Sequence, residues 1–141
     1  MTTNPLKQLP GYLLRRASAA TMGALAKRLE EIELTPSEAS VLLIIRENPE
    51  IIQSEIGRML GIVSANMTPL VARLEEREFV KRMPIDRRSF GLKTTRRGAQ
   101  AAERAFAAMQ EQEALLIEAV PAKHRAAFLQ ALNDLNAALE D

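Results

Sequence analysis

Positive charge gathers in one short stretch near the middle of this chain. Residues 77–97 hold eight lysine and arginine side chains against two acidic ones, a net charge of +6, whereas the whole chain of 141 residues nets only +1. Clustered guanidinium and ammonium groups attract the phosphates of nucleic acids. The chemistry that these residues predict is therefore the binding of a polyanion.

Residues suited to catalysis or to metal binding are sparse. The chain has no cysteine and one histidine, His124. This excludes disulfides and thiol chemistry, and it leaves no cluster of ligands for zinc or another transition metal. A Ser-His-Asp device would have to use His124, which falls in a predicted helix and is interpreted as a surface residue. We therefore predict that the protein is not an enzyme and holds no cofactor or metal.

The composition is that of an ordinary globular domain. Apolar residues make up 47% of the chain and charged residues 26%, which is typical of a soluble protein with one core. No apolar run reaches the length that crosses a bilayer, and the first residues lack the pattern of a signal peptide. These features predict a cytoplasmic protein without a membrane partner.

A helix-turn-helix is predicted immediately before the basic stretch. Thr35 and Glu38 form a capping box that starts a helix over residues 36–47. Two shorter helices follow, one near residues 54–60 and one that starts at Ser64. The short glycine-containing turn between them is typical of a helix-turn-helix.

The basic stretch itself has the pattern of a β-hairpin. Residues 79–83 and 89–94 are predicted strands, and residues 84–86 between them are a predicted turn. A helix-turn-helix followed by a basic hairpin is a winged helix. Such a fold can place a helix in a DNA groove and the hairpin on the backbone beside it.

Helices are predicted at both ends of the chain, over residues 10–33, 98–119 and 121–139. Their apolar side chains form long stripes that a domain of this size has little else to cover, so a second copy of the chain is the expected partner. A helical bundle within one chain is the alternative.

The predicted fold class is mainly α, with a small β wing. Residues 35–97 form the winged helix-turn-helix, which is the predicted DNA-binding region. Residues 1–34 and 98–141 form a predicted intertwined dimerisation region.

These elements and their residues resemble the MarR family of bacterial transcription regulators. The most specific match is the wing motif Asp-x-Arg-x-x-x-Leu, here Asp86, Arg88 and Leu92. The resemblance implies a homodimer whose N- and C-terminal helices interlock, with winged domains that bind adjacent major grooves of a pseudo-palindromic operator. Shorter motifs that also match are Leu60-Gly61-Ile62, Arg73-Leu74-Glu75 and Val80-Lys81-Arg82.

The chain departs from the family pattern in four places. Glu78 stands where the family usually has glycine, so a left-handed backbone there would be strained. Pro69 lies within the recognition helix, where the family often has a basic residue. Thr94-Thr95 replaces the usual Leu-Thr, and the wing is shorter than the common form.

Two groups of residues are predicted to contact DNA. Asn66 is the best candidate for a base edge, because its amide can pair with adenine, and Arg73 suits a phosphate. The resemblance implies that Arg88 enters the minor groove and that Asp86 orients its guanidinium. Helix capping is the alternative role for Ser64 and Thr68. The predicted major-groove residues are Ser64, Ala65, Asn66, Thr68, Pro69 and Arg73, and the predicted wing residues are Arg82, Asp86, Arg87, Arg88 and Lys93.

The resemblance also implies a small effector that binds between the dimer helices and the winged domain, such as an aromatic acid, a phenolic compound or an aromatic acyl-CoA. A ring for stacking, cations for an anion and pliable side chains are available on the predicted helices. A surface charge or a salt bridge between subunits is the alternative role for Arg15 and Arg16. The candidate effector residues are Tyr12, Arg15, Arg16, Ser18, Met22 and Arg46.

Together these predictions describe a ligand-responsive, homodimeric DNA-binding regulator that acts as a repressor. Its expected partners are double-stranded DNA, a second copy of the chain and the effector. The competing hypothesis is a winged helix that docks another protein and binds no operator. The cationic hairpin argues against this alternative, because such a docking module has no need of it.

Overall fold

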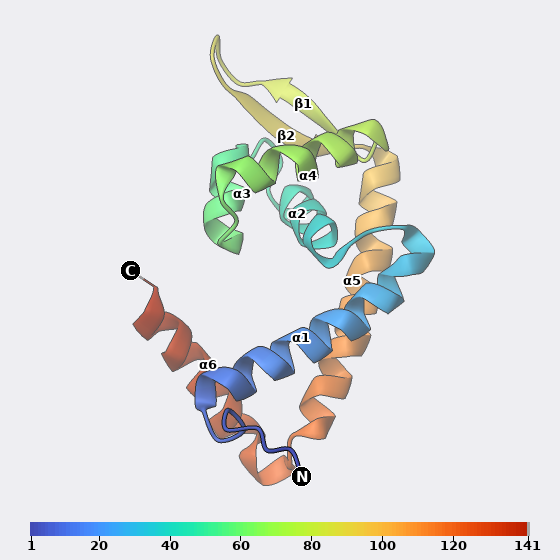
Figure 1. Cartoon of the computed structure of the whole chain (residues 1–141). Helices are drawn as coiled ribbons and strands as arrows, with labels where there is room; N and C mark the ends of the chain where they lie inside the picture. The colour runs from blue at the N-terminus through green and yellow to red at the C-terminus, as the bar shows by residue number, and fades with distance from the viewer. Residues whose placement is uncertain (141) are drawn as a thin grey trace.

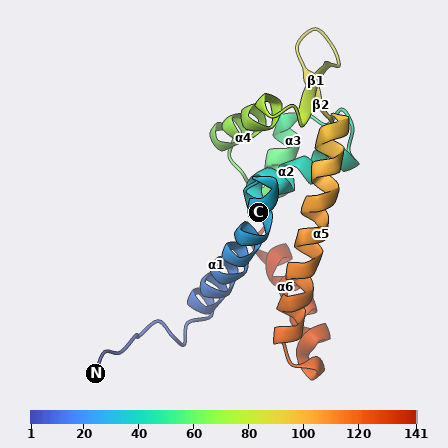
Figure 2. The ribbon, with the colours of Figure 1, turned by 90° about the vertical axis from the view of Figure 1, so that its right-hand side faces the viewer.

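The computed structural model describes residues 1–140 as six α-helices, two 3-10 turns and one β-hairpin. The hairpin and helices α2 to α4 form the upper part of the molecule in Figure 1, and α1, α5 and α6 extend below them (Figures 1 and 2). The elements are α1 (Pro10–Leu29), η1 (Glu30–Ile32), α2 (Pro36–Glu47), α3 (Gln53–Leu60), α4 (Ser64–Glu76), β1 (Val80–Pro84), β2 (Phe90–Thr94), α5 (Arg96–Ala119), η2 (Ala122–His124) and α6 (Arg125–Leu139).

This mainly helical architecture confirms the predicted fold class, with small shifts at the ends of elements. The first helix ends at Leu29 and the chain continues as the 3-10 turn η1, so the predicted helix over residues 10–33 was too long. Pro84 belongs to strand β1 and not to the turn. The last helix begins at Arg125, after the turn η2, and not near Pro121.

Helix α2 lies at the centre of the winged helix and packs against α1, α3, α4 and α5. It starts at the predicted capping box: the Thr35 hydroxyl accepts from the N–H of Glu38 at 3.1 Å, and the Glu38 carboxylate accepts from the N–H of Thr35 at 3.0 Å. The two bonds satisfy N–H groups that have no partner within the helix. Val41, Leu42 and Ile45 are fully buried, so α2 supplies the centre of the core.

The helix-turn-helix consists of α3, α4 and the turn between them. Gly61 ends α3 in a left-handed conformation with φ of 66°, which glycine adopts without steric cost. Helix α4 then turns one apolar face into the core and leaves the other exposed. The buried face consists of Met67, Leu70, Val71 and Leu74.

The wing is a two-stranded antiparallel hairpin. Its register pairs Val80 with Thr94 at the base and Pro84 with Phe90 near the tip. Outside the named strands, Ile51 forms an isolated bridge with Leu92, which anchors β2 to the segment after α2. Leu92 is buried, so the last residue of the wing motif belongs to the core.

The junction between the wing and α5 is closely packed. A Cβ built on Gly98 would lie 1.8 Å from the carbonyl oxygen of Phe79, so the backbones meet where only glycine fits. Thr95 caps α5 by accepting from the N–H of Gly98 at 2.9 Å, and its hydroxyl donates to the carbonyl of Glu78 at 2.6 Å. These contacts fix the start of α5 against the base of the hairpin.

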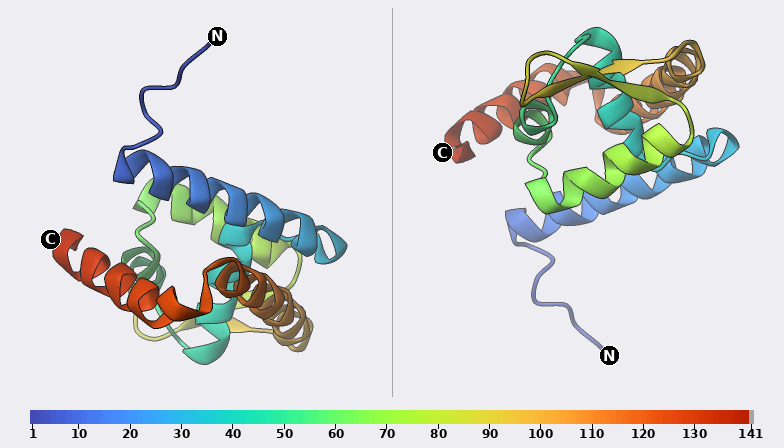
Figure 3. Two further views of the ribbon diagram at one scale, coloured as in Figure 1. Left: turned by 90° about the horizontal axis from the view of Figure 1, so that it is seen from below. Right: turned by 90° about the horizontal axis from the view of Figure 1, so that it is seen from above.

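The helices at the two ends of the chain leave much apolar surface open. In α1 only Leu25 and Leu29 are buried, and α6 has no buried residue. Figure 3 shows α1 and α6 from below, as two arms beside the end of α5. Within residues 1–140, no helix combines the length and the apolarity that crossing a membrane requires. The exposed apolar side chains on these three helices include Leu13, Leu14, Met22, Phe106, Leu115, Leu129, Leu135 and Leu139.

A small polar network joins α1 to α5. Arg28 donates to Glu111 at 2.7 Å and to Gln112 at 3.1 Å, and Gln112 donates to Thr21 at 3.4 Å. Gln112 is buried and satisfied, so it fixes how the two helices are placed relative to each other.

Candidate nucleic-acid interface

Helix α4 and the hairpin form the upper face of the molecule, which Figure 3 shows from above. All six residues predicted for the major groove are exposed on α4, whose buried residues are apolar. Asn66 is among them and lies in the first turn. The structure thus leaves every predicted major-groove residue accessible.

The structure tests the alternative role of helix capping for Ser64 and Thr68. The capping residue is Val63, and no side chain caps the helix, so the alternative of capping is wrong for Ser64. The Thr68 hydroxyl accepts from Gln53 at 3.2 Å and donates to the carbonyl of Ser64 at 3.4 Å. It is therefore satisfied locally and joins α3 to α4.

Pro69 is accommodated inside α4, which continues to Glu76. Proline has no N–H, so the carbonyl of Ala65 lacks its usual partner one turn later. Both residues are exposed. The missing hydrogen bond therefore falls in an exposed part of the helix.

Arg73 is less free than the sequence indicated. Its guanidinium lies 3.5 Å from the carboxylate of Glu38, whose side chain is only 6% exposed. That carboxylate also completes the capping box of α2. The sequence identified both residues, but not that the fold brings the last part of α4 over the start of α2.

Arg82 is also paired within the chain. Its Nε donates to Glu75 at 2.9 Å, and the two side chains are 44% and 31% exposed. The pair connects strand β1 with the last turn of α4. Sequence reasoning missed it, because it depends on the angle between the hairpin and the helix.

Asp86 shapes the turn of the wing through its backbone. Its carboxylate accepts from the N–H groups of Arg88 at 2.8 Å and Ser89 at 2.9 Å. The hydrogen bond from Arg88 and those from Ser89 hold the pKa of Asp86 below its ordinary value. Asp86 therefore fixes the turn on which Arg88 stands, and no ion pair within residues 1–140 joins its carboxylate to the guanidinium of Arg88. That Asp86 orients this guanidinium on DNA stays a prediction.

Four cations of the hairpin remain without a carboxylate partner within residues 1–140. All are exposed, and they lie on both strands and on the turn. Unpaired cations on one open element, beside the exposed face of a helix, form a surface suited to a polyanion. These cations are Lys81, Arg87, Arg88 and Lys93.

The predicted effector residues lie apart from this face. Five of them are on α1, where Arg15 lies 5.9 Å from the ring centre of Tyr12 and both Ser18 and Met22 are exposed. Arg46 is on α2, pairs with Glu47 at 3.2 Å and lies 6.0 Å from the ring centre of Phe106. The sequence did not single out Phe106 as a neighbour of Arg46, because the pairing depends on how α2 packs against α5.

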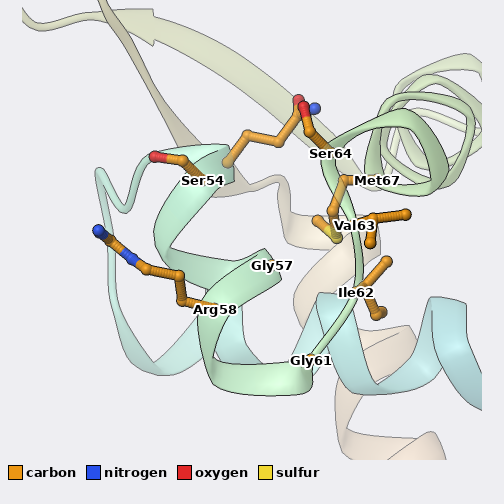
Figure 4. Close-up of a pocket in the computed structure, with 9 residues that line it drawn as sticks. Ser54, Gly57, Arg58, Gly61, Ile62, Val63, Ser64 and Met67 are labelled. Atoms are coloured by element: carbon orange, nitrogen blue, oxygen red, sulfur yellow. The ribbon is translucent and has the colours of Figure 1, made fainter. Parts of the chain in front are cut away.

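A cavity of about 550 Å³ opens between α3 and α4, beside the start of α4. Figure 4 shows Ile62, Val63 and Met67 together on one side of it, with Arg58 directed away from them. None of the predicted effector residues lines this cavity. Its position makes it part of the helix-turn-helix surface.

Comparisons with known proteins agree with this architecture. The model of the MarR family matches residues 34–90, which cover most of the winged helix. A putative transcriptional regulatory protein for the hcr operon of Thauera aromatica is 30% identical in an alignment of 106 residues that covers 73% of this chain. The match spans 64% of the length of that relative.

Solved structures extend the similarity to the whole chain. The transcriptional repressor CouR bound to a 23-mer DNA duplex is 32% identical, with a TM-score of 0.86 over 96% of this chain and 98% of that one. CouR bound to p-coumaroyl-CoA is 30% identical, with a TM-score of 0.87 over 100% and 99%. A Mycobacterium tuberculosis MarR-family protein in complex with salicylic acid is 26% identical, with a TM-score of 0.72 over 89% and 95%. Taken with the winged helix, its outward helix face and its unpaired cations, these matches show that the chain belongs to the MarR family of transcriptional regulators.

Proposed function

We propose that this protein is a homodimeric repressor that binds a pseudo-palindromic operator and is released from it by an aromatic effector. The observation that carries the proposal is the group of four unpaired cations on the hairpin, next to the exposed face of α4. The similarity to CouR, which is found both on DNA and with p-coumaroyl-CoA, supports the two halves of the proposal.

The proposed dimer uses the helices at the two ends of the chain, in residues 1–34 and 98–141, of which residue 141 lies outside the described part. Helix α6 has 15 residues, none of them buried. An isolated helix of this length is marginal in water, because most helical stability in proteins comes from packing. A second subunit would supply that packing, and it would place two winged helices, each within residues 35–97, side by side.

Contacts to DNA are proposed for both parts of the interface. Asn66 reads a base edge in the major groove through its amide. Pro69, three residues later, lies beside it on the helix, and Ser64 and Ala65 are exposed in the same first turn. Arg88 reaches the minor groove from the turn that Asp86 fixes, and a guanidinium suits the negative potential there. Arg87 and Lys93 hold the backbone, which positions the protein without reading sequence.

The proposed effector is an aromatic acid, a phenolic compound or an aromatic acyl-CoA. Residues on the exposed part of α1, namely Tyr12, Arg15, Arg16, Ser18 and Met22, lie on the proposed dimer helices, while Arg46 stands over Phe106 between α2 and α5. A ligand at this junction releases DNA only if it binds another dimer geometry more tightly than the DNA-binding one.

Binding to the DNA upstream of the protein's own gene tests the proposal. A gel shift should show one complex that p-coumaroyl-CoA or a simple aromatic acid such as salicylic acid dissolves. Absence of any shift with upstream or generic duplex, even at low salt, would refute DNA binding and favour a winged helix that docks another protein. A complex that persists with every aromatic acid and thioester tested would refute the proposed class of effector.

A further inference from the structure

Two lysines face each other across the hairpin, on the side of the sheet opposite Arg82. The register pairs Lys81 of β1 directly with Lys93 of β2, and it pairs Arg82 with Leu92. Directly paired residues of an antiparallel ladder share a face, and successive residues of a strand alternate between faces. Both lysines are exposed, and neither forms an ion pair within residues 1–140.

The positive charges of Lys81 and Lys93 repel each other, and no carboxylate within residues 1–140 forms an ion pair with either lysine. Like charges directly opposite each other on a sheet destabilise it, and an anion placed between them relieves the repulsion. The nearby carboxylates are already matched to other groups: Glu75 pairs with Arg82 at 2.9 Å, and Glu78 faces Arg97 at 3.9 Å. The two ammonium groups therefore remain available to an external anion.

The surroundings of Lys81 are open and hold both cations and carboxylates. Lys81 lines an open cavity of about 460 Å³ between the end of α4 and the start of α5. Arg96 and Arg97 line the same cavity, together with Glu75 and Glu78, which pair with Arg82 and Arg97. Lys81 is exposed, so an extended polyanion that passes the hairpin can reach it.

We propose that Lys81 and Lys93 form a phosphodiester-binding site for the DNA backbone, and that Glu75 withholds Arg82 from this task. The inference rests on the proposed DNA-binding function and deepens it: Lys81 joins the interface, and Arg82, predicted from the sequence as a wing residue that contacts DNA, leaves it. Arg82 instead ties β1 to α4 and so positions the wing relative to the recognition helix.

The salt dependence of DNA binding tests this site. The full-length protein is titrated onto a fluorescent duplex of generic sequence, and the binding constant is measured by anisotropy over a series of KCl concentrations. Each phosphate contact contributes about −0.9 to the slope of log K against log salt concentration. Lys81→Gln should therefore make the slope less negative by about 0.9 for each bound subunit, and Lys93→Gln should do the same.

Lys123→Gln is the matched control, because it removes an exposed lysine from η2, outside the hairpin. Its slope should equal that of the wild type, and Lys81→Arg, which keeps the charge, should also retain the wild-type slope. Between about 50 and 200 mM salt, the affinity of Lys81→Gln should fall about 3.5-fold less than that of Lys123→Gln for each bound subunit. Arg82→Gln, which tests whether Arg82 contacts a phosphate, should lose less of the slope than Lys81→Gln. Circular dichroism and thermal unfolding check that each variant is folded.

Failure of the lysine site and failure of the proposed DNA-binding function give different results in this experiment. A wild-type slope for Lys81→Gln, or a loss of slope in Arg82→Gln as large as in Lys81→Gln, would overturn the lysine site while leaving DNA binding intact. A folded wild-type protein that binds no duplex at the lowest salt would overturn the proposed function and the site with it.

Discussion

Ion pairs with carboxylates determine which arginines of the DNA-binding candidates remain available to an external anion. Glu38 and Glu75 hold Arg73 and Arg82, while Asp86 is used on the backbone and leaves the guanidinium of Arg88 unpaired. Counting basic residues in the sequence treats all of these cations as equivalent. Within the basic stretch of residues 77–97, carboxylates pair with Arg77, Arg82 and Arg97, and four of the five remaining cations lie on the strands and turn of the hairpin.

Glu78 is the clearest case of local strain. Its φ of 60° lies in the left-handed region, as the family comparison of the sequence anticipated for this glycine position. A residue with a side chain is disfavoured there by about 1 kcal/mol or more. Glu78→Gly should raise the free energy of unfolding by about 1 kcal/mol, as measured by urea denaturation.

Glu78→Ala is the matched control for that prediction. It removes the same carboxylate and its exposed contact with Arg97 at 3.9 Å, but it keeps a Cβ in the left-handed conformation. A gain of stability in the alanine variant as large as in the glycine variant would show that charge, and not backbone strain, is responsible.

The lowered pKa of Asp86 predicts that the geometry of the wing turn depends on pH only in acid. Its pKa in the folded protein lies below the ordinary 3.8, because the charged form accepts hydrogen bonds from Arg88 and Ser89. A lowered folded pKa means that the stabilisation is present above the ordinary pKa and is lost as the pH falls through the folded pKa. The turn should therefore keep its geometry at every pH above about 4 and loosen only in stronger acid.

NMR of the amide protons of Arg88 and Ser89 measures this effect. Their shifts should titrate together at acid pH and should lose that titration in Asp86→Asn, whose side-chain oxygen accepts without ionising. Amide shifts that move near pH 6 in both proteins would contradict the assignment to this carboxylate.

At the scale of elements, the position of the wing depends on its junction with α5. The close approach of Gly98 to Phe79 and the capping by Thr95 link the base of the hairpin to a helix that reaches the other end of the molecule. A change in the direction of α5 would therefore be transmitted directly to the hairpin.

Gly98→Ala should disturb this junction. The added Cβ would lie 1.8 Å from a backbone oxygen that no side-chain rotation can move away. We expect a loss of about 3 kcal/mol in the free energy of unfolding, typical of severe overpacking. Gly11→Ala, where nothing lies within 4 Å, is the control, and it should change stability by less than about 0.5 kcal/mol. Equal melting temperatures for the two variants would contradict the clash.

Elements could be predicted from the sequence where their signals are local. Thr35, Glu38 and Gly61 mark helix ends by their own chemistry, and the structure has these ends as expected. The pairing of Arg82 with Glu75 could not be predicted, because it depends on the angle between the wing and α4. Helix α4 begins at Ser64, as predicted, but the position that precedes it is Val63, so the alternative capping role of Ser64 does not hold.

At the scale of the whole molecule, the exposed apolar helices remain the strongest sign of a second subunit. The single chain shows which surface is open but not which residues meet across it, so the predicted division into dimerisation and DNA-binding regions stays a prediction. The roles of the effector residues also stay predictions, because the proposed effector site is complete only when two subunits meet.

Leu135→Glu tests the proposed dimer. Leu135 is exposed on α6. A twofold interface would lose the apolar contact of Leu135 in both subunits, which is about 3 kcal/mol of association free energy in total. This loss would weaken the dimer more than about 100-fold. Analytical ultracentrifugation should find a dimer in the wild type and a folded monomer in the variant, and operator affinity should fall with it. Asn133→Glu, on the other side of the helix, should remain dimeric. A monomeric wild type at micromolar concentration would refute the assembly.

The outer edge of β1 has a consequence for the behaviour of the protein in concentrated solution. Within the described residues, β1 has a strand neighbour on one side only, so its other edge exposes backbone groups that another molecule could extend into a larger sheet. Pro84 offers no N–H for such pairing, and Lys81 brings charge to the same strand, which are two of the means by which proteins discourage fibre formation. The residues that suit the wing to a polyanion therefore also help to keep crowded copies of the protein from aggregating through their wings.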